Sequence, residues 1–146
     1  MAGTVEHIHL AADYEGTPEP APEVAAEAGQ GLRGDRYFDD EDAGDITLIE
    51  AEALERLSVE LGIDLPEGAS RRNVTTRGID LGELVGRRFR VGDAVCEGEE
   101  RCEPCLHLTK VTREPALLRG LVHTGLRAAI VESGTIRVGD PVEALP

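Results

Sequence analysis

The residues best suited to chemistry in this chain are three cysteines and a histidine that lie within twelve positions of one another. They are Cys96, Cys102, Cys105 and His107. Because two residues separate Cys102 from Cys105, both sulfurs can approach one centre. Three chemistries are open: a zinc site with all four residues as ligands, a Cys102–Cys105 redox pair, or a lone Cys105 thiolate that binds a soft metal or carries sulfur. The alternative is that the cysteines are small buried hydrophobic residues.

The context of the cysteines bears on these alternatives. A zinc knuckle usually has two well-spaced pairs of ligands, and this chain has one pair. Cys96 is expected in the middle of a strand, with its own orientation. A thioredoxin-like pair precedes a helix in a βαβ unit, and Pro104 followed by Leu-His-Leu-Thr does not match that context.

A second constellation is Arg71-Arg72-Asn73. Two guanidiniums beside an amide suit a phosphate and the polar edge of a heterocycle. Charge alone favours a simpler interpretation, a pair of surface arginines at the start of a strand. In a third segment, Gly31 to Tyr37, the glycines could let the backbone approach a ligand. His7 and His9 share one face of an expected strand and are interpreted as packing residues.

Charge and composition restrict the partners. The 146 residues fit a single domain, and they carry 29 acidic against 15 basic residues, a net charge of −14. Such a field repels nucleic acids and anionic membranes, so neither is an expected partner. The spread of acidic residues favours adaptation to a salt-rich host. No apolar run spans a bilayer and no signal peptide is recognised, so we expect a cytoplasmic protein whose cysteines are thiols or ligands.

The elements that must position these residues are short strands. Alternating and β-branched patterns predict strands at 5–10, 45–49, 72–76, 87–91, 94–97, 126–131, 135–138 and 142–145. Helices are predicted at 50–61, ending at Gly62, and at 115–121, with a short turn or helical segment at 81–85. Residues 11–30 and 39–42 are expected to be loops. Gly92-Asp93 and Ser133-Gly134 predict two hairpins. The fold class is therefore mainly β, a small barrel or sandwich with helical additions.

Several segments together resemble a known family. The segments are Gly31–Tyr37, Asp45–Glu50, Arg71–Leu81, Cys102–Cys105 and Gly125–Asp140. Their order and spacing are similar to those of a stand-alone MOSC domain, the C-terminal domain type of molybdenum cofactor sulfurases. The resemblance runs from about residue 4 to the end of the chain, and it implies one MOSC domain over residues 1–146 with a barrel-like β fold.

The resemblance also implies a site. Cys105 would be the catalytic residue and the thiolate ligand of molybdenum in a molybdenum cofactor. Arg71 and Asn73, with Arg72 beside them, would hold the pterin and its phosphate. Because Lys110 is the only lysine, Arg33 and Arg36 would serve at the phosphate as well. Related enzymes reduce N-hydroxylated small molecules with electrons from a partner protein, and pyridoxal phosphate binding is a further expectation.

Two other functions stay open. In the first, Cys105 carries a persulfide that it receives from a sulfur-donor protein and delivers to an acceptor. In the second, the chain is a non-enzymatic zinc-binding or structural domain that uses Cys96, Cys102, Cys105 and His107.

Overall fold

The computed structural model describes residues 2–12, 18–39, 44–62, 72–102 and 125–146. Most of them are in strands, and one α-helix and one 3-10 helix occur among them. Within this described part, no helix has the length and apolarity that a bilayer crossing requires. The elements are β1 (Ala2–Leu10), β2 (Glu19–Pro20), β3 (Glu23–Glu27), β4 (Gly31–Leu32), β5 (Ile46–Glu50), α1 (Ala51–Leu61), β6 (Val74–Arg77), η1 (Leu81–Leu84), β7 (Arg88–Val91), β8 (Ala94–Cys102), β9 (Gly125–Glu132), β10 (Gly134–Arg137) and β11 (Pro141–Ala144).

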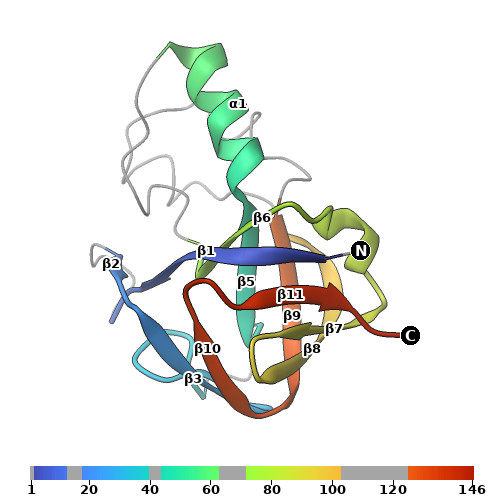
Figure 1. The fold of residues 1–146 in the computed structure, drawn as a ribbon. Coiled ribbons are helices and arrows are strands. Elements are labelled where there is room, and N and C mark those ends of the chain that lie inside the picture. Colours follow the sequence, from blue (N-terminus) through green and yellow to red (C-terminus); the bar gives the residue numbers. More distant parts are fainter. Residues whose placement is uncertain (1, 13–17, 40–43, 63–71, 103–124) are drawn as a thin grey trace.

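Seven strands close into a barrel. Their order is β11-β7-β8-β9-β5-β6-β1, and β1 pairs back onto β11. Neighbours are antiparallel except β5 and β6, which run parallel and are joined by a connection that contains α1. A second sheet, β10-β3-β4, lies below β1 and β11 in the view of Figure 1, and α1 projects from the opposite end of the barrel. The mainly β, barrel-like fold class is confirmed.

Alternation along the strands builds the core. In β7, Phe89 and Val91 are buried, while Arg88 is exposed. The same pattern on the other strands gathers aliphatic side chains inside the barrel, where aromatic residues are scarce. Gly98 in β8 is needed for a close approach, because a Cβ atom there would lie 2.1 Å from the carbonyl oxygen of Leu84. The 3-10 helix therefore packs directly against the β8 backbone.

The helix α1 confirms the predicted amphipathic segment and its end. Ala53 and Leu57 are buried, and Val59 on the outer face is exposed. Gly62 adopts the left-handed conformation, with φ of 68°, and its N–H caps the last turn. Carboxylates of the helix tie it to the barrel, since Glu52 accepts a hydrogen bond of 2.8 Å from the backbone N–H of Gly78.

Two expectations about connections were wrong. Residues 11–30 contain β2 and β3 and are not simply a loop. The hairpin expected across Ser133-Gly134 does not form, because β9 pairs with β5 and β8, whereas β10 leaves the barrel and pairs with β3. Alternation locates a strand but says nothing of its partner. The hairpin across Gly92-Asp93 is confirmed by the β7–β8 pairing, and the helix expected at 115–121 lies outside the described residues.

Candidate functional site

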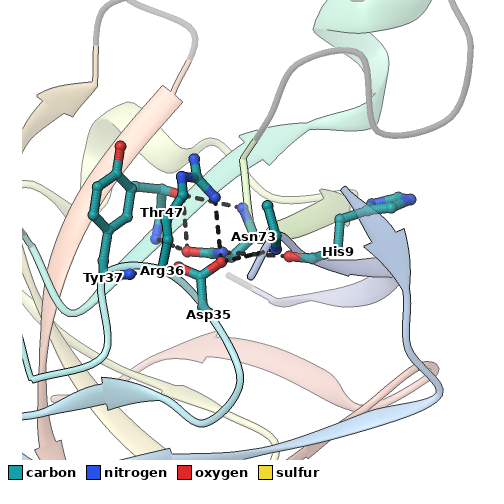
Figure 2. Close-up of polar contacts among 7 residues, drawn as sticks. His9, Asp35, Arg36, Tyr37, Thr47 and Asn73 are labelled. Atoms are coloured by element: carbon teal, nitrogen blue, oxygen red, sulfur yellow. Dashed lines mark hydrogen bonds and ion pairs between the residues drawn. The ribbon is translucent and has the colours of Figure 1, made fainter. Parts of the chain in front are cut away.

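Asn73 joins two barrel strands at the point where β6 begins. It is 2% exposed. Its Oδ1 accepts hydrogen bonds from the backbone N–H of Thr47, at 3.1 Å, and from the Thr47 hydroxyl, at 3.0 Å. The backbone N–H of Asn73 donates to the same hydroxyl oxygen at 3.0 Å. These contacts, drawn in Figure 2, link Thr47 to Asn73, one residue before the first backbone pair of the parallel strands β5 and β6, Leu48 with Val74.

The same asparagine also holds β1. The backbone N–H of His9 donates to the Asn73 carbonyl at 2.7 Å, and Asn73 Nδ2 donates to the His9 carbonyl at 3.3 Å. The side-chain oxygen of Asn73 thus has both its lone pairs used by Thr47. One Nδ2 hydrogen is the donor that the amide retains for a ligand. Asn73 is therefore first a clamp between β1 and β5, and it can offer a ligand a single hydrogen bond.

A buried ion pair lies in the turn after β4. Asp35 Oδ1 accepts hydrogen bonds from the backbone N–H of Ala11, at 3.1 Å, and from Arg36 Nη1, at 3.2 Å, while Oδ2 accepts from the Tyr37 N–H at 3.4 Å. The Asp35 and Arg36 side chains are 3% and 8% exposed. Gly34, with φ of +90°, makes the turn possible because this conformation costs glycine little.

The end of β1 brings this turn close to Asn73. Ala11 exchanges hydrogen bonds with the turn, since its carbonyl accepts from the Arg36 N–H at 2.8 Å, and His9, two positions earlier, is held by Asn73. Figure 2 draws both sets of contacts, those of Asp35 and Arg36 and those of Thr47 and Asn73. The Arg36 guanidinium lies over the ring of Tyr37, with Cζ 4.4 Å from the ring centroid. A cation-bearing turn and an amide from distant segments are therefore both held at the end of β1.

The predicted site residues divide into three groups. Arg72 is buried, as are Asn73 and the Arg36 side chain. The Arg33 side chain is 63% exposed and pairs with Glu27 at 3.0 Å, so it stands apart from them. Arg71 and Cys105, the predicted thiolate, lie outside the described residues.

Cys96 is fully buried in the barrel core, opposite Phe89 and Ile130 on the neighbouring strands. Burial, with a smaller contribution from the Asp45 carboxylate, raises the pKa of the Cys96 thiol to about 12. The thiol is thus protonated at neutral pH, as a packing residue would be, and a metal would require the thiolate. No three acidic, histidine or cysteine side chains are placed to hold a metal ion among the residues that the structure describes.

Three residues of this site were not singled out in the sequence: Asp35, Thr47 and His9 in its role as a backbone partner. Asp35 carried a usable signal, because an aspartate in a glycine turn commonly accepts hydrogen bonds from nearby backbone N–H groups. The sequence carried no signal for the roles of Thr47 and of the His9 backbone. Their role depends on Asn73, which is 26 positions from Thr47 and 64 from His9.

Comparisons with known proteins agree with this architecture. The family model described as "MOSC domain" matches residues 11–143, and no curated protein matches the chain. The crystal structure of the YuaD protein from Bacillus subtilis is similar with a TM-score of 0.80 and 19% identity, over 99% of this chain and 96% of that one. YiiM from Geobacillus stearothermophilus is similar with a TM-score of 0.79 and 17% identity, over 99% of this chain and 75% of that one. YiiM from Escherichia coli is similar with a TM-score of 0.77 and 16% identity, over 100% of this chain and 70% of that one. These likenesses concern the fold, whereas the family match covers most of the sequence. The chain therefore belongs to the MOSC domain family, which is associated with molybdenum cofactor binding.

Proposed function

We propose that this chain binds a molybdenum cofactor at the site around Arg36, Arg72 and Asn73, with Cys105 as the thiolate ligand of the metal. The observation that carries the proposal is the burial of two arginine side chains in a chain of net charge −14. A guanidinium is normally left in water unless a buried partner compensates its charge. Asp35 pairs with the Arg36 guanidinium. Because each guanidinium carries five N–H donors, two buried guanidiniums still suit an anionic ligand.

The donor set fits such a ligand. Guanidiniums donate and do not accept, and they match phosphate oxygens in a planar fork. Asn73 adds one N–H for the polar edge of a heterocycle. Arg71 directly precedes Arg72 and would add a third cation. The phosphate and pterin of a molybdenum cofactor present acceptors of these kinds, and a soft thiolate such as Cys105 is a suitable protein ligand for molybdenum.

Each residue then has a defined task. Arg71 and Arg72 neutralise the phosphate, which the rest of this acidic protein repels, and Arg36 donates hydrogen bonds to it while paired with Asp35. Asn73 orients the heterocycle while it holds β1 and β5 together. The Cys105 thiol loses its proton to solvent when it becomes a ligand. The bound metal would supply two-electron redox chemistry.

We extend the proposal to the reduction of N-hydroxylated small molecules with electrons from a donor protein. In the net reaction, R–NH–OH takes up two electrons and two protons and yields R–NH2 and water, so the N–O bond is reduced. Pyridoxal phosphate binding and a salt-rich host find no support in the family or the fold. The buried, protonated Cys96 weighs against the zinc alternative that requires it as a ligand.

The test is metal and pterin analysis of protein made in a host with active molybdenum cofactor synthesis. We expect stoichiometric molybdenum that is lost in Cys105→Ser and kept in the matched control Cys96→Ala. Loaded protein, reduced chemically, should convert an N-hydroxylated compound to its amine. Stoichiometric zinc that disappears in both Cys96→Ala and Cys102→Ser would refute the proposal in favour of a zinc domain. Neither metal, with cyanide-labile sulfur on Cys105, would refute it in favour of a sulfur carrier.

A further inference from the structure

Asp35 and Arg36 form an ion pair unlike the surface pairs of this protein. Their closest atoms, Oδ1 and Nη1, are 3.2 Å apart, and both side chains are almost completely buried. Asp93 and Arg137 have a similar separation of 3.3 Å, but their side chains are 68% and 51% exposed. The two pairs differ in burial and not in contact geometry. Water screens the surface pair, whereas Asp35 and Arg36 attract one another inside the protein, where water screens them little.

The turn itself does not explain why an arginine is buried there. Two of the Asp35 contacts are with backbone N–H groups, those of Ala11 and Tyr37, and they hold the turn without any cation. Arg33, three positions before Arg36, shows that an arginine near this turn can stay at the surface. Burial of Arg36 is therefore an additional feature, and it holds a guanidinium in the turn that bonds to the end of β1.

We propose that Asp35 is a positioning residue for ligand binding, because its buried carboxylate fixes the Arg36 guanidinium at the site before a ligand arrives. The proposal rests on the proposed function for the nature of that ligand, an anion with a phosphate group. Asp35 takes one edge of the guanidinium fork and Tyr37 covers its face. A preorganised fork loses less conformational freedom when it binds phosphate than a mobile arginine would.

Loss of the carboxylate charge should release the arginine. In Asp35→Asn the amide oxygen can still accept from the Ala11 N–H, so the main contact with β1 can persist. The guanidinium, however, would lose the charge of Asp35, and the Arg36 side chain should become more mobile. Asp93→Asn is the matched control, because it makes the same chemical change in a pair of the same length at the surface.

The first test needs no cofactor. Heteronuclear NOE values of the arginine Nε–H groups, with Arg36 assigned by Arg36→Lys, report whether each side chain is rigid on the nanosecond timescale. We expect Arg36 to be rigid and Arg137 mobile in the wild-type protein, and Arg36 to become mobile in Asp35→Asn but not in Asp93→Asn. A mobile Arg36 in the wild-type protein would overturn the proposal with no variant required. A rigid Arg36 in folded Asp35→Asn would also overturn it.

The second test measures the rate at which the cofactor is released, and the fluorescence of the freed pterin reports that rate. A lost charge-assisted hydrogen bond should speed release roughly tenfold in Arg36→Gln, and by somewhat less in Asp35→Asn. In Asp35→Asn/Arg36→Gln the release should be no faster than in Arg36→Gln alone, whereas a purely structural effect of Asp35 would add to it. The melting temperature, measured in parallel, should fall with Asp35→Asn in both backgrounds.

The outcomes separate the two proposals. Fast release from Arg36→Gln with wild-type release from Asp35→Asn would overturn the role of Asp35 and leave the proposed function standing. Wild-type release from Arg36→Gln would show that Arg36 does not hold the cofactor, which removes it from the proposed site and overturns the role of Asp35 in binding. Wild-type protein without any cofactor would overturn the proposed function, and the NMR result would still decide whether Asp35 holds Arg36.

Discussion

The clamp formed by Asn73 should be one of the most costly polar contacts to remove. Asn73→Ala deletes three side-chain hydrogen bonds, two with Thr47 and one with the His9 carbonyl. At about 1 kcal/mol net for each bond, the free energy of unfolding should fall by roughly 3 kcal/mol. Because the site is buried, the orphaned Thr47 N–H and His9 carbonyl would add to this figure.

A loss of this size is a large fraction of the ~5–15 kcal/mol that stabilises a typical domain. For a chain of this length, it corresponds to a decrease in melting temperature of roughly 10 °C. Urea denaturation followed by circular dichroism measures the free energy, and calorimetry measures the melting temperature. The conservative control is Thr47→Ser, which keeps the hydroxyl and should cost much less than Thr47→Val.

Asn73 and Thr47 should also be energetically coupled. Asn73 and Thr47 exchange several hydrogen bonds, so the costs of Asn73→Ala and Thr47→Val should not add in the double variant. A loss below about 1 kcal/mol in Asn73→Ala would refute the reasoning, since it would mean that no buried group is left unsatisfied. Fully additive costs in the double variant would show that the two residues do not act as one unit.

Three further changes test other parts of the structure. Gly98→Ala should strongly destabilise the barrel and lower the melting temperature, because the new Cβ would meet the Leu84 carbonyl oxygen; an unchanged melting temperature would contradict the packing of η1 on β8. Arg77→Gln breaks ion pairs with Glu6 and Glu55 but should have a small effect that disappears in high salt, since the pairs are exposed and screened. Cys96 should resist alkylation in the native protein at pH 8 and react once urea unfolds it, because its pKa is raised to about 12. The contribution of this neutral thiol to the free energy of unfolding is complete below pH 9, its ordinary pKa, and is lost as the pH rises toward 12. In Cys96→Ala, the free energy of unfolding should therefore not show this loss between pH 9 and pH 12.

Much of the fold follows from local patterns. Alternation located most of the barrel strands, and helical periodicity with Gly62 located α1 and its end. These features depend on residues that are close in the chain, so the sequence contains the required information. The partner of β10 does not follow in this way, because a strand that alternates well can pair with any neighbour that offers a matching face.

The site, like the fold, has features that the sequence predicts and others that it does not. The sequence alone determined the order and spacing of the arginines and asparagine at 71–73 and of the glycine turn at 31–37, which resemble those of MOSC domains; their binding of an anion stays a prediction. It did not distinguish Arg33 from Arg36, which have the same side chain in the same turn. Only the tertiary structure decided between them, because Asp35 binds the Ala11 N–H, 24 positions away in the chain, and so draws Arg36 into the protein while Arg33 remains in water. A buried charge is held by the partners that surround it in space, and those partners come from segments that no local pattern connects.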